Sequence, residues 1–154
     1  MLSNTRQGRE DDRPVKRYLM EYASLLKRQQ TLADELDRLY AAATRATASL
    51  SAVGPSGGLN AGAREDAVLR AIDGETRLRE VTAHIGEALS ARLVLIERLP
   101  EERQKTLMTL RYISGWGWER IGYEMHYERT QVFDIHRQAL EAAQEAFDAM
   151  RLGM

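Results

Sequence analysis

The chain has 154 residues, of which 44% are hydrophobic and 29% are charged, and its formal net charge is −1. This length suits one domain, or one small domain with an extended helical partner, and the composition is typical of a folded globular protein. A nearly neutral charge excludes a global electrostatic field that draws the chain to nucleic acid. Residues 101–154 contain seven basic and nine acidic groups, so DNA binding by this region would require a local basic patch.

The sequence contains no cysteine, which excludes disulfides and thiolate metal sites. Its first seventeen residues are rich in charge and lack the apolar segment of a secretory signal. The longest uncharged stretch, residues 46–63, contains Pro55 and several glycines, which is not the composition of a membrane span. We therefore expect a cytoplasmic protein that does not contact a membrane.

A long helix is predicted from Pro14, after a polar tail at 1–13. Ala, Leu, Arg and Glu are frequent, and because these residues favour helices they predict an all-α fold. Apolar residues recur at heptad spacing in two rows, interrupted by Gln29, which is the pattern of a coiled-coil seam. One row is Tyr18, Leu25, Leu32, Leu39 and Ala46, and the other is Tyr22, Leu36, Ala43 and Leu50.

A flexible connector is predicted at 51–63, where glycines and Pro55 disfavour regular structure. A second long helical pattern follows and extends to Leu99. It needs a partner helix, which is either the first helix, folded back as an antiparallel hairpin, or a helix of a second copy in a homodimer. Gly74 and Gly86 allow a bend or a close approach. The apolar stripe of this helix is Val68, Ile72, Leu78, Ile85, Leu89, Leu93 and Ile96.

A separate unit at 101–150 is predicted after the hairpin at 14–99, because Pro100 ends the second helix. Three short helical patterns follow with brief connectors, at 101–114, 118–125 and 128–150. Gly115 suits a helix C-terminus that needs positive φ, and Gly122 is small enough for two crossing helices to meet. This arrangement is typical of a helix-turn-helix. The expected inward residues are Leu107, Leu110, Tyr112, Ile113, Trp118, Ile121, Gly122, Met125, Val132, Ile135, Ala139, Ala142 and Phe147.

Residues 118–140 read WERIGYEMHYERTQVFDIHRQAL and resemble the fourth conserved region of bacterial sigma factors. They are also similar to phage late-transcription activators of the RinA type. The preceding residues 107–117, LMTLRYISGWG, resemble the helix that this family places before the motif. Long helices before such a motif are also a feature of small phage and prophage proteins. The resemblance implies a DNA-binding transcriptional regulator in the cytoplasm of a bacterial host, with double-stranded DNA and RNA polymerase as partners.

The resemblance makes the helix from Glu128 the recognition helix of the major groove. Its residue types suit base edges, since Arg pairs with guanine, Gln with adenine and Asp with cytosine, while Thr and Phe pack on the thymine methyl. Three positions depart from the family: His126 replaces a common glycine, Glu128 replaces a Ser or Thr cap, and Asp134 adds negative charge. The candidate DNA contacts are Arg129, Thr130, Gln131, Phe133, Asp134 and Arg137, with Arg111 and Arg120 as weaker candidates for phosphate contacts.

An alternative function is a helical protein-interaction module that keeps the helix-turn-helix shape and binds a protein, which the acidic C-terminal third permits. Trp118 is expected in the core, whereas Trp116 suits either the core or base stacking. The three histidines are too scattered for a metal pair on one helix, and no serine lies in a nucleophile motif. We therefore expect no enzymatic activity, no cofactor and no metal.

Overall fold

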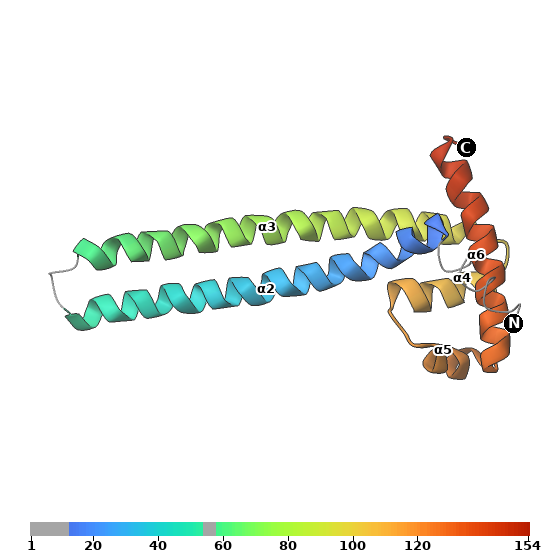
Figure 1. The fold of residues 1–154 in the computed structure, drawn as a ribbon, viewed down its shortest axis with the longest axis horizontal. Helices are drawn as coiled ribbons and strands as arrows, with labels where there is room; N and C mark the ends of the chain where they lie inside the picture. Colours follow the sequence, from blue (N-terminus) through green and yellow to red (C-terminus); the bar gives the residue numbers. More distant parts are fainter. Residues whose placement is uncertain (1–12, 54–57) are drawn as a thin grey trace, which may run out of the picture. The chain divides into compact units, whose positions relative to one another are not determined.

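The structure, a computed structural model, describes residues 13–53 and 58–154, without the side chains of residues 47, 49–53 and 58–61. The described residues form helices and no strand, as the composition predicts (Figure 1). None of the described helices is long and apolar enough to cross a membrane. In chain order the elements are α2 (Pro14–Val53), α3 (Gly58–Glu97), α4 (Glu102–Met108), the π-helix η1 (Thr109–Ile113), α5 (Trp118–Met125) and α6 (Arg129–Arg151).

The chain divides into two compact units, and both dividing points lie within the long helices. Unit 1 combines residues up to 24 with Gly86–Met154, and unit 2 is Leu25–Ile85. The boundary expected near Pro100 therefore lies inside unit 1. The reason is packing, because the end of α3 shares one buried core with α4 and α6. Pro100 does mark a break in the helix, since α3 ends at Glu97.

Unit 2 is an antiparallel pair formed by α2 and α3 of the same chain (Figure 1). The predicted hairpin is thus confirmed, and α3 finds its partner helix within one chain. Gln29, which interrupts the predicted seam of α2, donates from Nε2 to Thr82 Oγ1 at 3.0 Å. Farther along, a Cβ at Gly74 would lie 3.1 Å from Leu36 Cδ1. Gly74 therefore permits the close approach that the sequence predicted, whereas Gly86 has no neighbour within 4 Å.

The buried face of α3 differs from the predicted stripe. Val68, Ile72 and Leu93 are 44%, 51% and 39% exposed, so the prediction is wrong for these three residues. The apolar stripe contains large side chains only, whereas the buried face of α3 also includes two alanines and one arginine. The predicted residues Ile85 and Ile96 are buried. The other buried residues of α3 are Ala71, Ala88, Arg92 and Leu95.

The connector is shorter than predicted. Helix α2 continues to Val53 and α3 begins at Gly58, so only residues 54–57 separate the helices. A glycine costs about 1 kcal/mol in a helix, but lengthening an existing helix avoids the unfavourable step of nucleation. Residues 54–57 and most of the predicted tail at 1–13 lie outside the described residues, as does the Leu50 side chain.

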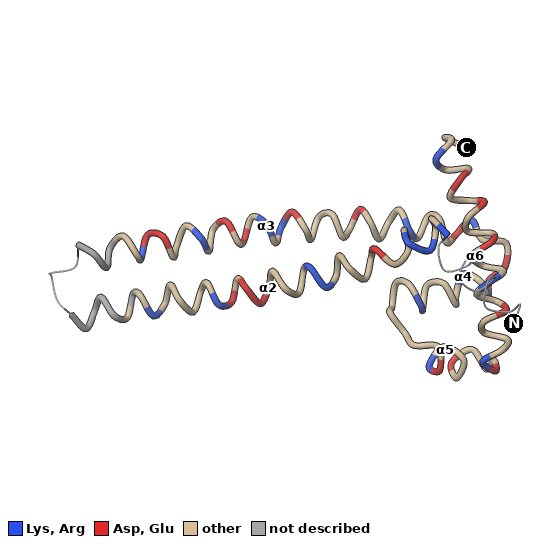
Figure 2. The backbone as a smooth tube through the Cα atoms, viewed as in Figure 1, with Lys and Arg blue, Asp and Glu red and all other residues tan. Residues whose placement is uncertain are grey.

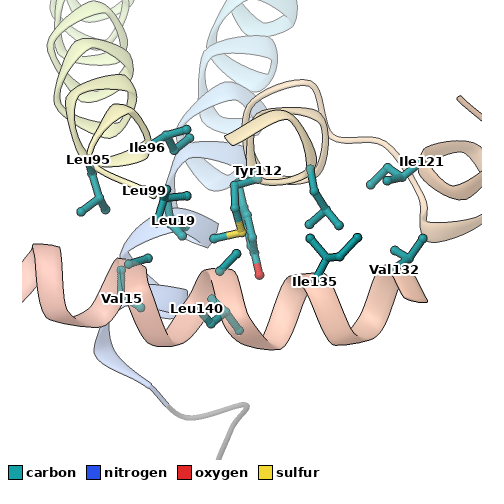
Figure 3. Packing of buried hydrophobic residues seen from close by; sticks show 14 residues of the cluster. Val15, Leu19, Leu95, Ile96, Leu99, Tyr112, Ile121, Val132, Ile135 and Leu140 are labelled. Atoms are coloured by element: carbon teal, nitrogen blue, oxygen red, sulfur yellow. The ribbon is translucent and has the colours of Figure 1, made fainter. Parts of the chain in front are cut away.

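Helix α6 is the central element of unit 1. Its buried side chains contact residues from the beginning of α2, the end of α3, α4 and α5, as Figure 3 shows. Gln144 accepts a hydrogen bond at 3.0 Å from the Val15 backbone N–H, a donor that the first turn of α2 leaves without a helical partner. The inward stripes predicted for the short helices are confirmed as buried or half-buried. The core cluster contains Val15, Leu19, Leu95, Ile96, Leu99, Leu107, Met108, Tyr112, Ile121, Val132, Ile135, Ala139, Leu140 and Ala143.

Arg92 is a buried cation in the interface between α2 and α3 and is only 3% exposed. Its Nε and Nη2 donate to the Tyr18 carbonyl oxygen at 3.1 and 2.6 Å, and Nη1 donates to the Ala88 carbonyl oxygen at 3.0 Å. The guanidinium lies 4.0 Å from the centroid of the Tyr18 ring, and Nη2 lies 3.6 Å from Glu21 Oε2. These partners satisfy a charge that would otherwise be costly to bury.

Candidate nucleic-acid interface

The turn between α5 and α6 depends on two residues with special backbone requirements. His126 ends α5 with φ 59° and ψ 40°, in the left-handed region, as expected for a residue that replaces glycine. The Tyr127 N–H then donates to the Gly122 carbonyl oxygen at 2.9 Å. A Cβ at Gly122 would lie 2.9 Å from the Tyr127 carbonyl oxygen. The predicted role of Gly122 is confirmed, because the turn has no space for a side chain there.

A capping interaction fixes the start of α6. Glu128 precedes the helix, and its backbone N–H donates to Gln131 Oε1 at 2.9 Å. The cap uses the side-chain oxygen of a predicted base contact, so Gln131 stabilises the helix start. The spacing of these two residues is that of a capping box with Glu in the place of Ser or Thr. The sequence therefore carried a signal for this role.

Aromatic rings line the inner side of the helix-turn-helix. Trp118 is half-buried, and its ring centroid lies 4.6 Å from that of His136 and 5.3 Å from that of Phe133. Trp118 packs against the core, as predicted. Trp116 is also half-buried and packs at the edge of the same core. The packing of both tryptophans fixes the segment that leads into α5.

The six candidate contacts on α6 are all exposed and lie in its first three turns. They differ in their neighbours. Asp134 Oδ1 lies 3.4 Å from Arg137 Nη2, which offsets part of the unfavourable negative charge. The Arg129 guanidinium lies 5.5 Å from the centroid of the exposed Phe133 ring. Thr130 is exposed at the first turn of the helix.

The two weaker candidates lie in different surroundings. Arg120 is exposed on α5, with its guanidinium 3.7 Å from the centroid of the Trp116 ring. Arg111 is half-buried in η1, where Nη1 donates to the Trp116 carbonyl oxygen at 3.1 Å. Its guanidinium also lies 4.2 Å from the centroid of the Trp118 ring. Arg111 therefore supports the aromatic loop before α5, and it also lines a pocket together with Phe133 and Arg137 of α6.

Arg103 and Lys105 are two further cations of the C-terminal region, and each forms an ion pair with a glutamate at the start of α4. Arg103 Nε lies 2.6 Å from Glu101 Oε2, and this hydrogen bond raises the pKa of Arg103 above its ordinary value. Lys105 Nζ lies 3.1 Å from Glu102 Oε1, and this contact raises the pKa of Lys105. Acidic residues also lie among the basic ones along α5 and α6 (Figure 2). The local basic patch consequently depends on a few arginines.

Comparison with known proteins provides no relative from which the role of this site can be inferred. No protein-family model, curated protein or solved structure matches the chain. The resemblance to sigma factors and RinA-type activators remains an expectation from the sequence. The structure adds a fixed turn, a capped and exposed helix, and arginines set on aromatic rings.

Proposed function

We propose that the protein is a DNA-binding transcriptional regulator of phage or prophage type, and that α6 reads double-stranded DNA. One observation supports this most directly. Arg129, Phe133 and Arg137 are exposed on one side of α6, while Val132 and Ile135 anchor its opposite side in the core. A helix held in this way enters a major groove with its N-terminal residues toward the base edges.

The proposal gives different tasks to the eight candidate residues. Arg129 and Thr130 at the helix start, with Phe133 one turn later, read base edges. Arg137 and Arg120 contact phosphates on either side of the groove. The three remaining candidates, Gln131, Asp134 and Arg111, position these groups through the cap, the ion pair and the loop described above.

The hairpin of α2 and α3 is proposed to bind a protein partner, either RNA polymerase or a second copy of the chain. In unit 2 the side chains of Val68, Leu69 and Ile72 are 44%, 59% and 51% exposed. Neighbouring exposed apolar residues of this kind are typical of protein-interaction surfaces. The same observation favours the second candidate function, a protein-interaction module that does not bind DNA.

Selection from a library of genomic DNA fragments at low and moderate salt tests the proposal. The unmodified protein should enrich one sequence motif, and Arg129→Ala should lose the enrichment because a bidentate Arg–guanine contact contributes about 1–3 kcal/mol of discrimination. Arg151→Ala is the matched control, since Arg151 is an exposed arginine at the other end of α6. Affinity should also fall with added salt, because phosphate contacts release counterions.

Two results would contradict DNA reading. Retention of no DNA at low salt would leave the protein-interaction module as the better function. Equal loss of enrichment in Arg129→Ala and Arg151→Ala would show that α6 contributes only charge.

A further inference from the structure

A pocket of about 470 Å³ lies within unit 1, between the beginning of α2, the segment around η1 and the exposed side of α6. This volume falls in the range of small-molecule sites. The pocket includes residues of α2 that lie outside the helix-turn-helix. Its lining combines basic and aromatic side chains, and both kinds of side chain indicate which class of ligand the pocket can bind.

Among the described residues, four basic side chains and no acidic side chain line the pocket. They are Arg13 and Lys16 at the beginning of α2, Arg111 in η1 and Arg137 on α6. Four cations from three parts of the fold create a positive potential that favours an anion. A phosphate is the fitting anion, because guanidinium groups bind its oxygens through paired, charge-assisted hydrogen bonds.

Arg13 and Arg137 each lie near a carboxylate that is not part of the lining. Glu141 Oε1 lies 3.9 Å from Arg13 Nη2, and Asp134 Oδ1 lies 3.4 Å from Arg137 Nη2. The side chains of both acids are more than half exposed, at 62% and 65%. Exposed pairs of this kind are weak, so a phosphate in the pocket can replace them as the partner of each arginine.

Four ring-bearing side chains also line the pocket, two of them buried and two less buried. Tyr112 and His136 are buried, with the Tyr112 hydroxyl 2.7 Å from His136 Nε2. Trp118 and Phe133 also line the pocket and are less buried than that pair. These rings contact one another and form one aromatic wall. Such a wall favours a planar ligand, since aromatic surfaces stack on bases without requiring a particular sequence.

We propose that this pocket binds a nucleoside phosphate, with its base against the rings of Trp118 and Phe133 and its phosphate between Arg13, Lys16 and Arg111. The ligand class follows from the two kinds of lining, because an anion without a ring leaves the aromatic wall unused. A neutral ring leaves the cations unused. The pocket overlaps the proposed DNA-binding side of α6 at Phe133 and Arg137, but Arg13 and Lys16, at the start of α2, belong to the pocket alone.

Tryptophan fluorescence provides the readout. The chain has two tryptophans, so Trp116→Phe leaves Trp118 as the single reporter in the pocket wall. We expect titration with adenosine monophosphate (AMP) to quench this emission with saturation. In the same background, Arg13→Ala and Lys16→Ala should each weaken AMP binding by about tenfold or more, the loss of one charge-assisted hydrogen bond.

Arg17→Ala is the matched control, because Arg17 is an exposed cation on the same turn of α2 that does not line the pocket. It should retain the affinity of the parent. Adenosine and inorganic phosphate should both bind more weakly than AMP. The proposal is overturned if AMP gives no saturable quenching, if all three alanine variants lose affinity equally, or if adenosine or phosphate binds as tightly as AMP. The titration contains no DNA, so a failure of the DNA proposal leaves its result unchanged.

Discussion

The two units of this chain use the same helix-forming residues but differ in how burial is distributed. In unit 1 large side chains such as Leu19, Leu95 and Ile121 are fully buried, and they come from segments far apart in the sequence. In unit 2 a single pair of helices meets through a narrow seam, most of which is half-buried. Burial of large residues from many elements specifies one arrangement, whereas a two-helix seam leaves apolar surface for another partner.

The largest expected effect is loss of a core leucine from unit 1. Leu107→Ala should lower the free energy of unfolding by about 2–5 kcal/mol, because Leu107 is 0% exposed and truncation leaves a cavity. Leu39→Ala in unit 2 should cost less than half as much, since Leu39 is half-buried and its surroundings can close around the gap. Urea denaturation of both variants measures the difference. Equal losses would contradict the contrast between the units.

The second effect concerns the turn of the helix-turn-helix. Gly122→Ala should destabilise unit 1 by about 1–3 kcal/mol, because its Cβ would meet the Tyr127 carbonyl oxygen, a backbone atom, at 2.9 Å. Gly86→Ala is the opposite control, since nothing lies within 4 Å of its Cβ. That substitution should stabilise α3 by about 1 kcal/mol. Thermal unfolding measures whether each variant is less or more stable than the parent. An unchanged unfolding temperature in Gly122→Ala would show that the turn can open.

A smaller effect is expected where α6 caps α2. Gln144→Ala should cost about 1 kcal/mol, because the Val15 N–H loses the side chain that accepts its hydrogen bond. Hydrogen exchange should report the loss as faster exchange of amides in the first turn of α2. Gln138→Ala, at an exposed position of the same helix, should leave these rates unchanged. Unchanged rates in Gln144→Ala would show that water replaces the cap.

The smallest effect on stability should accompany the largest effect on association. Ile72→Glu changes an exposed residue of unit 2 and should alter the free energy of unfolding by less than about 0.5 kcal/mol. If the hairpin pairs with a second copy, the substitution should shift the protein to monomers in sedimentation equilibrium. If the unmodified protein is monomeric at high concentration, the homodimer proposal is contradicted and RNA polymerase is left as the proposed partner.

Local signals allowed much of the fold to be predicted from the sequence. Pro14 begins α2, Gly115 has φ 73° and His126 has φ 59°, because each property depends on one residue and its neighbours. The bounds of α5 agree for the same reason. The π-helix η1 was not predicted, since an extra residue in one helical turn leaves no distinctive pattern in a single sequence.

Tertiary packing accounts for what the sequence did not reveal. Val68 and Ile72 were assigned to the interface by size, although the seam of α3 uses Ala71 and Gly74. Arg13 and Arg137 line the same pocket, and no periodicity relates two residues so far apart in the chain. For α6 the sequence identified the exposed residues, and the capping-box spacing of Glu128 and Gln131 carried a signal for the cap that the prediction of base contacts did not use.

Arg92 has a consequence for the alignment of the two long helices. A heptad seam looks similar after a shift of one repeat, so apolar contacts alone would tolerate α3 sliding along α2. Such a shift would separate the Arg92 guanidinium from the Tyr18 carbonyl oxygen and leave a buried charge without its partner. Arg92 therefore specifies the register of the two long helices, because its hydrogen bonds form in one alignment and are lost in the shifted ones.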